Sequence, residues 1–155
     1  ARATARLVEP IARKHNVSVS ISSEGKAMAM GDAVQLEQVL SNLVVNGIHA
    51  CHTGGKVEIA CGTETASQTD PGANEKRAYL RVTDDGHGMD EQTKARIFEP
   101  FFTTKDVGQG TGLGLSVAHG IVLENGGSIS VTSQAGQGST FSVFFPAVIS
   151  RSRAP

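Results

Sequence analysis

The stretch "SISVTSQAGQGSTFSVFFP", residues 128–146, decides the fold class because it predicts two neighbouring strands at the C-terminal end of a chain that also contains helices. Both halves are rich in Val, Phe, Ser and Thr, and Gly136 and Gly138 supply a turn between them. A helix over residues 113–127 precedes it and ends in the stop signal "NGG". Adjacent strands beside helices predict an α+β fold, a two-layer α/β sandwich with helices on one face of a mixed sheet.

The rest of the chain continues this mixture. We expect helices over residues 2–15, 32–51 and 90–100, strands over 17–22, 56–62 and 78–86, and a polar loop over 63–77. Asp32 is the expected N-cap of the long helix, and Pro100 ends the short one. The chain therefore reads as one domain over residues 1–148, followed by a tail or linker over 149–155.

Composition excludes several function classes. The chain has 155 residues, of which 39% are apolar and 19% charged, and its net charge is −1, so nothing indicates a nucleic-acid or anionic-membrane surface. No apolar run approaches the roughly 20 residues of a membrane span, and no signal-peptide pattern is present. Cys51 and Cys61 form no C-x-x-C pair and the histidines no metal-binding pattern, which predicts reduced thiols and a cytoplasmic protein.

The long helix carries a polar stripe opposite its apolar one. At 100° per residue, Asn42 and Asn46 share one face with two glutamines and His49, while leucines occupy the other. A solvated face is the simpler reading, but such faces favour Lys, Glu and Arg, whereas Asn is a poor helix former. Two amide oxygens one turn apart are ligands that Mg²⁺ accepts.

Two glycine-rich segments are typical of nucleotide contacts. "VTDDGHGMD" places Asp84 at the end of a strand, where a carboxylate can accept a hydrogen bond from an exocyclic amine. "GQGTGLGLS", residues 108–116, precedes a helix and offers free backbone N–H groups to an anion, with Lys105 close by to neutralise charge. Solvated turns are the alternative for each segment alone. Walker A and G-x-G-x-x-G loops are both missing from the sequence.

Together these segments resemble a known family. In order and spacing, "QLEQVLSNLVVNGIHA", "DDGHGMD", "IFEPFFTTK", "GQGTGLGLS" and "GQGSTFSVFFP" resemble the N, G1, F, G2 and G3 boxes of the catalytic ATP-binding domain of bacterial sensor histidine kinases. That domain belongs to the gyrase, Hsp90, histidine kinase and MutL superfamily. The resemblance covers residues 5–146 and implies that the chain binds ATP with Mg²⁺.

The resemblance implies a role for each matching residue. Asn46 would bind Mg²⁺ with Asn42 as its partner, and Asp84 would recognise the adenine amine. Departures from the family pattern are Gly47 for Ala, Asn125 for a frequent His, and His49 for Lys or Arg, the last leaving the part of His49 in phosphate binding open. Asn46 and Lys105 are the expected catalytic residues, and the remaining expected nucleotide contacts are Gly86, Gly88, Gly110, Thr111, Gly112, Leu113, Gly114 and Ser139.

The resemblance also favours phosphoryl transfer over hydrolysis. Hydrolysing members of the superfamily have a Glu one turn before the Mg²⁺ asparagine, and this chain has Asn42 there. None of its histidines precedes Asp or Glu, so the resemblance implies that the acceptor lies on a separate dimeric helical domain of a larger sensor kinase, upstream of a response regulator. The expected activity is protein-histidine kinase, by a domain that is monomeric alone. An anti-sigma-type serine kinase and a non-catalytic nucleotide-binding module are the alternatives.

Aromatic residues flank the second glycine segment. We expect Phe98, Phe101 and Phe102 to anchor the base of a mobile lid, formed by residues 103–114, that covers the phosphates.

Overall fold

The computed structural model describes residues 1–24, 31–66, 75–105 and 110–147. Every helix and strand that the sequence predicts is found. In chain order the elements are α1 (Arg2–His15), β1 (Ser18–Glu24), α2 (Ala33–Ala50), β2 (Lys56–Thr65), β3 (Lys76–Asp84), α3 (Glu91–Arg96), α4 (Gly114–Glu124), β4 (Ser128–Ser133) and β5 (Ser139–Pro146).

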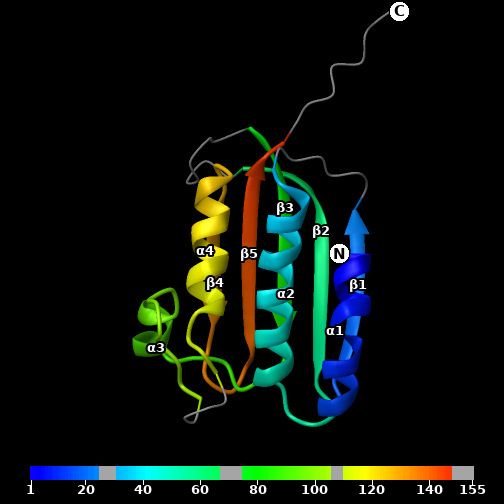
Figure 1. Cartoon of the computed structure of the whole chain (residues 1–155), viewed down its shortest axis with the longest axis vertical. Coiled ribbons are helices and arrows are strands. Elements are labelled where there is room, and N and C mark those ends of the chain that lie inside the picture. Colours follow the sequence, from blue (N-terminus) through cyan, green and yellow to red (C-terminus); the bar gives the residue numbers. More distant parts are fainter. Residues whose placement is uncertain (25–30, 67–74, 106–109, 148–155) are drawn as a thin grey trace, which may run out of the picture.

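The strands form one mixed sheet in the order β1-β2-β3-β5-β4 (Figure 1). β1 runs parallel to β2 and is connected to it through α2, whereas the other neighbours are antiparallel. The register pairs Asp84, the last residue of β3, with Val57 of β2 and Ser139 of β5. Two expected site residues, Asp84 and Ser139, therefore meet at one end of the sheet.

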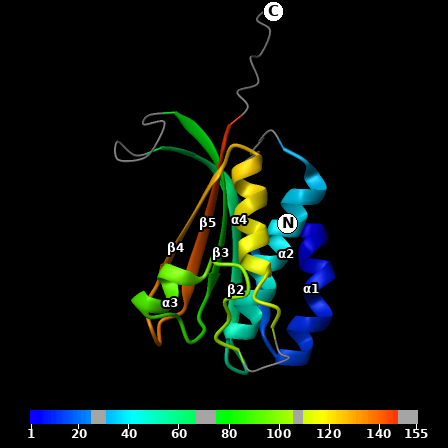
Figure 2. The ribbon, with the colours of Figure 1, turned by 60° about the vertical axis from the view of Figure 1, so that its left-hand side comes forward.

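Helices α1, α2 and α4 cover one face of this sheet, as Figure 2 shows. The predicted two-layer α+β sandwich is thereby confirmed. The core between the layers centres on α2, whose apolar stripe is buried against the sheet; its buried residues are Val39, Leu40, Leu43, Val44, Gly47 and Ile48.

Polar side chains fix the start of α2. The Asp32 carboxylate accepts hydrogen bonds from the N–H groups of Val34 (2.7 Å) and Gln35 (3.3 Å), as an N-cap residue does. Asn125, at the end of α4, donates to Gln35 Oε1 at 2.8 Å and accepts from the Asp32 N–H at 3.3 Å. The family departure at Asn125 thus ties α4 to the start of α2.

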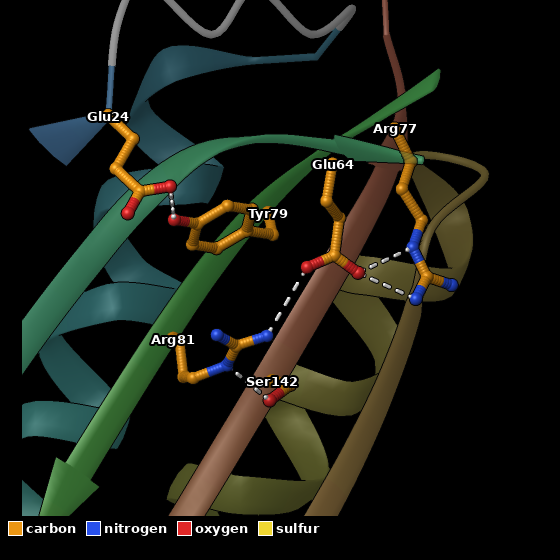
Figure 3. Close-up of polar contacts among 6 residues, drawn as sticks. All are labelled: Glu24, Glu64, Arg77, Tyr79, Arg81 and Ser142. Carbon is orange, nitrogen blue, oxygen red and sulfur yellow. Dashed lines mark hydrogen bonds and ion pairs between the residues drawn. The ribbon is translucent and has the colours of Figure 1, made fainter. Parts of the chain in front are cut away.

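The other face of the sheet carries a polar network (Figure 3). Glu64 accepts two hydrogen bonds from Arg77, at 3.0 and 2.7 Å, and lies 3.4 Å from Arg81. Tyr79 donates to Glu24 across β2. Because side chains alternate along a strand, these polar residues face away from the helices while their neighbours fill the core.

This network explains a wrong prediction. Residues 63–77 are not all loop: β2 continues to Thr65 and β3 already begins at Lys76. The two ends of this stretch, residues 63–65 and 76–77, are strand with one solvated face, and Glu64 pairs with Arg77 in the strand register. The short helix also ends earlier than expected, at Arg96 instead of Pro100.

Two further expectations concern the chain ends and membranes. The expected tail, 149–155, lies outside the described residues, so the domain boundary stays a prediction. Among the described residues, no helix combines the length and the apolar character that a membrane crossing requires.

Candidate functional site

A pocket of about 440 Å³ opens between α2, the ends of β3 and β5, and the start of α4. Its apolar wall includes Val45, Met89, Ile97, Leu115 and Phe141, which lie within the five boxes but were not among the expected contacts. A largely apolar pocket with a few convergent polar groups is typical of a small-molecule site. The expected site residues that line it are Asn42, Asn46, Asp84, Gly88, Lys105, Gly110, Thr111, Gly112, Gly114 and Ser139.

The amide pair of α2 faces this pocket. Asn42 Nδ2 donates to the carbonyl of Gly114 at 3.0 Å, which fixes α2 against the start of α4. Within the described part of the chain, the Asn46 side chain makes no hydrogen bond. A Cβ placed on Gly114 would lie 3.7 Å from Asn42 Oδ1 and 3.9 Å from Asn46 Nδ2, so the two amides lie close together. Two neutral amide oxygens that line one pocket fit a Mg²⁺ ion.

Asp84 supplies a carboxylate at the pocket. The residue is only 5% exposed, and burial raises the pKa of its carboxyl, while the N–H groups of Gly86 and Ser139 act in the opposite direction. The Gly86 N–H donates to Asp84 Oδ1 at 2.9 Å. Among the described residues that line the pocket, Asp84 is the only carboxylate.

The neighbouring Asp85 has a structural part instead. Its Oδ1 accepts hydrogen bonds from the N–H of Lys56 (2.7 Å) and from the thiol of Cys51 (3.4 Å). Burial, followed by the hydrogen bond with Asp85, raises the pKa of Cys51 to about 11, so it is a protonated thiol. Asp84, the last residue of β3, thus lines the pocket, while Asp85, the first residue after the strand, fixes the start of β2.

The glycines of "DDGHG" serve close packing. A Cβ on Gly86 would lie 2.4 Å from the carbonyl oxygen of Ala50, which places the loop against the end of α2. Gly86 therefore does not line the pocket. Gly88 does, with φ of +63°, and a Cβ there would lie 1.9 Å from the carbonyl oxygen of Gln134.

Ser133 organises this end of the pocket and was missed from the sequence. Its buried hydroxyl accepts from the N–H of Met89 at 2.9 Å, donates to the Gly138 carbonyl at 2.9 Å, and lies 3.0 Å from the hydroxyl of Ser139. It links the loop after β3 to both strands of the last hairpin. The one sequence signal for this role is that Ser133 pairs with Ser139 if the last two strands form a hairpin.

The base of the expected lid is anchored differently from the prediction. Phe98 and Phe102 pack against the core, but Phe101 is 74% exposed with φ of +66°, so its expected anchoring part is wrong. Its backbone makes the link instead: the N–H donates to Gly112 O at 2.9 Å. A Cβ on Gly112, whose φ is +65°, would lie 2.5 Å from the Phe101 carbonyl carbon.

Helix α4 begins directly after this link. Its N-cap residue, Leu113, makes no side-chain capping bond, is 36% exposed, and does not line the pocket. The first N–H groups of α4 therefore lack a side-chain cap beside the pocket, an arrangement suited to an anion.

A lysine and a histidine meet on the wall beside the amides. Lys105 Nζ lies 3.1 Å from His49 Nδ1, and burial lowers the pKa of Lys105. The Lys105 N–H donates to Thr103 Oγ1 at 3.1 Å, which fixes the backbone from which the side chain extends. The pocket thus has a carboxylate on one element and a cation on another.

Comparison with known proteins places this site in a family. Residues 31–149 match the family described as histidine kinase-, DNA gyrase B-, and HSP90-like ATPase. The chain is 39% identical to sensor kinase CckA of Brucella abortus over 134 residues, and 42% identical to sensor histidine kinase ZraS of Escherichia coli over 120 residues. These matches cover 79% and 77% of this chain but only 14% and 23% of the relatives' lengths.

Solved structures show the same fold. The catalytic domain of histidine kinase ThkA has a TM-score of 0.76 at 31% identity, with 94% of this chain and 88% of that chain covered. Full-length ShkA in complex with AMPPNP has a TM-score of 0.77 at 26% identity, with 95% of this chain but 29% of that chain covered. The resemblance inferred from the five boxes is confirmed.

Proposed function

Because the chain belongs to the family of histidine kinase-, DNA gyrase B- and HSP90-like ATPases, we propose that it binds Mg-ATP and donates the γ-phosphoryl group to a histidine on a separate phosphoacceptor domain. The observation that carries this proposal is one pocket that combines a buried carboxylate, an amide pair and the uncapped start of a helix. The chain spans 14% and 23% of the lengths of CckA and ZraS, and we place the acceptor histidine on a separate domain of the parent protein.

Adenine fits the end of the pocket that contains Asp84. The carboxylate can accept a hydrogen bond from the exocyclic amine, and the N–H of Gly86 holds it in place. Gly88 lines the pocket, where its bare backbone can lie against the ring, and its packing against Gln134 leaves no room for a side chain. Met89 and Phe141 supply apolar surface for the base.

The triphosphate fits the opposite end. Asn46 and Asn42 would hold a Mg²⁺ ion, which when bound neutralises charge on the phosphate oxygens. Lys105 supplies a positive charge, and the first turn of α4 supplies backbone N–H groups. Phosphoryl transfer requires mainly positioning and charge neutralisation, and these groups supply both.

The ionisable groups of the pocket favour phosphoryl transfer to a histidine over hydrolysis of ATP. Asp84 is the sole carboxylate among its described lining residues, and we assign it to adenine. Asn42 stands where a water-activating Glu would be needed, and its amide is engaged with Gly114. The chain's own residues then position the γ-phosphate, whose bond to the β-phosphate oxygen breaks as a bond to the acceptor imidazole nitrogen forms.

The partners we propose follow from this reaction. They are the dimeric helical phosphoacceptor domain of the parent protein and, downstream, the receiver domain of a response regulator. ThkA has been solved in complex with response regulator TrrA, and this chain matches 39% of that ThkA chain with a TM-score of 0.71. We further propose a cytoplasmic domain that is monomeric alone, in a parent that a membrane segment can anchor.

The test is transfer of label from γ-labelled ATP to the separately purified phosphoacceptor domain of the parent protein. We expect Mg²⁺-dependent labelling that acid removes, as for a phosphorus–nitrogen bond, and its loss in Asn46→Asp and Asp84→Asn. Acid-stable label would indicate the serine-kinase reading. ATP binding without labelling would indicate a non-catalytic module, and wild-type labelling by Asn46→Asp would overturn the metal assignment.

A further inference from the structure

Three side chains from separate elements form a contact chain beside the pocket. Lys105, in the segment after α3, places its Nζ 3.1 Å from Nδ1 of His49 on α2. The ring of His15, the last residue of α1, packs edge-on against the His49 ring, with centroids 5.1 Å apart at 61°. Lys105 and His49 line the pocket, whereas His15 contacts the His49 ring without lining the pocket.

A charged Lys105 at this distance fixes the protonation of His49. An ammonium group can only donate, so Nδ1 of His49 must accept and the ring is neutral. Burial, and then the charges of Lys105, His15 and Lys14, lower the pKa of His49. A neutral ring adds no positive charge to the pocket, so it cannot itself neutralise phosphate.

Lys105 has few other restraints on its ammonium group. In the described part of the chain, neither Lys105 nor His49 has an ion-pair partner. The middle of the Lys105 side chain passes close to Gly110, where a Cβ would lie 3.2 Å from Lys105 Cδ. The contact with His49 therefore sets where the positive charge stands.

We propose that His49 is a positioning residue that holds the Lys105 ammonium at the phosphate end of the pocket, with His15 supporting the His49 ring from α1. This inference rests on the proposed nucleotide binding and adds to it a residue that acts through Lys105 and makes no charged contact of its own. Since α1 comes first in the described chain, it also gives the N-terminal helix a mechanical link to the phosphate end of the site.

A double-mutant cycle tests the link. We would measure the Kd of Mg-ATP, ADP and adenosine by titration calorimetry for His49→Ala, Lys105→Met and the double variant. His49→Ala should raise the Kd of ATP about fivefold, the scale of one hydrogen bond, and leave adenosine unchanged. In the Lys105→Met background the same change should have less than about a twofold effect.

Matched variants separate positioning from general damage. His49→Asn places an amide oxygen near the position of Nδ1 and should restore the affinity for ATP to within about twofold of wild type. His15→Phe keeps a ring against His49 and should bind ATP more tightly than His15→Ala. The control is His52→Ala: His52 is exposed just after the end of α2 and does not line the pocket, so this change should leave every Kd unaltered.

The outcomes are distinguishable. Equal losses for His49→Ala with and without Lys105, or an equal loss for adenosine, would overturn the positioning role while nucleotide binding stood. Wild-type protein that binds neither ATP nor ADP would overturn the proposed function and this inference with it.

Discussion

Replacing Gly88 by alanine should destabilise the protein far more than the same change at Gly136. Both glycines have positive φ, +63° and +80°, and both lie where the loop after β3 meets the β4–β5 turn. A Cβ on Gly136 would have no atom within 4 Å, whereas one on Gly88 would lie 1.9 Å from the Gln134 carbonyl oxygen. The pair therefore separates backbone strain from steric conflict.

The magnitudes follow from these two terms. Holding alanine at positive φ costs about 1–2 kcal/mol, and this applies to both variants. At Gly88 the Gln134 carbonyl must also move, although it accepts the Gln137 N–H at 3.0 Å, and such overpacking costs about 1–3 kcal/mol more. We expect a loss of about 1–2 kcal/mol for Gly136→Ala and of roughly 3 kcal/mol or more for Gly88→Ala.

Urea unfolding followed by circular dichroism measures the free energy of unfolding for each variant. ATP titration on the same samples should show near-wild-type affinity for Gly136→Ala and weakened affinity for Gly88→Ala, because only the latter moves the wall of the pocket. Losses of unfolding free energy that agree within about 0.5 kcal/mol would refute the steric argument.

Three further outcomes are expected. Asp32→Ala should lower the free energy of unfolding by about 1 kcal/mol, since two N–H groups of α2 lose their acceptor, whereas Asp32→Asn should preserve stability in thermal unfolding. Asp84→Asn should abolish ATP binding without lowering the free energy of unfolding at pH 7. Because the pKa of Asp84 is raised in the folded protein, its carboxyl makes the free energy of unfolding fall as pH rises above the ordinary aspartate range. The variant should therefore show a flatter dependence of stability on pH, and a steeper one would contradict the assignment. Phosphate release from Mg-ATP without an acceptor domain should be slow, and rapid turnover in a coupled assay would favour the ATPase reading.

The parts of the fold that sequence predicted are those set by local physics. The two-faced pattern of α2 and its Asp32 cap are properties of one helix, and both are found. Asp84 was chosen over Asp85 from the family resemblance, as the first residue of the D-x-G-x-G pattern, and the structure places it alone of the two on the pocket wall. The polar Glu64–Arg77 pair was misread as loop, since composition alone does not reveal a strand with a solvated face.

The parts that sequence did not predict depend on contacts between distant residues. Phe101 turns outward because its N–H bonds to Gly112, eleven positions later, in a positive-φ conformation that no aromatic pattern indicates. Ser133 acquires its part only when the last hairpin brings it beside Met89. His49 was visible on the polar face of α2, but its contacts with Lys105 and His15 require three elements to be assembled.

The pocket gathers the features that cost the fold stability. Asp84 is buried with a raised pKa, Lys105 is half-buried with a lowered pKa, and within the described residues neither has an ion-pair partner of opposite charge. An adenine amine would give Asp84 a hydrogen-bond donor and a phosphate would give Lys105 an opposite charge, so one ligand relieves both. A nucleotide that binds only the folded protein therefore raises the free energy of unfolding. One ligand would offset the cost of both buried charges, so we assign the two groups to a single nucleotide site.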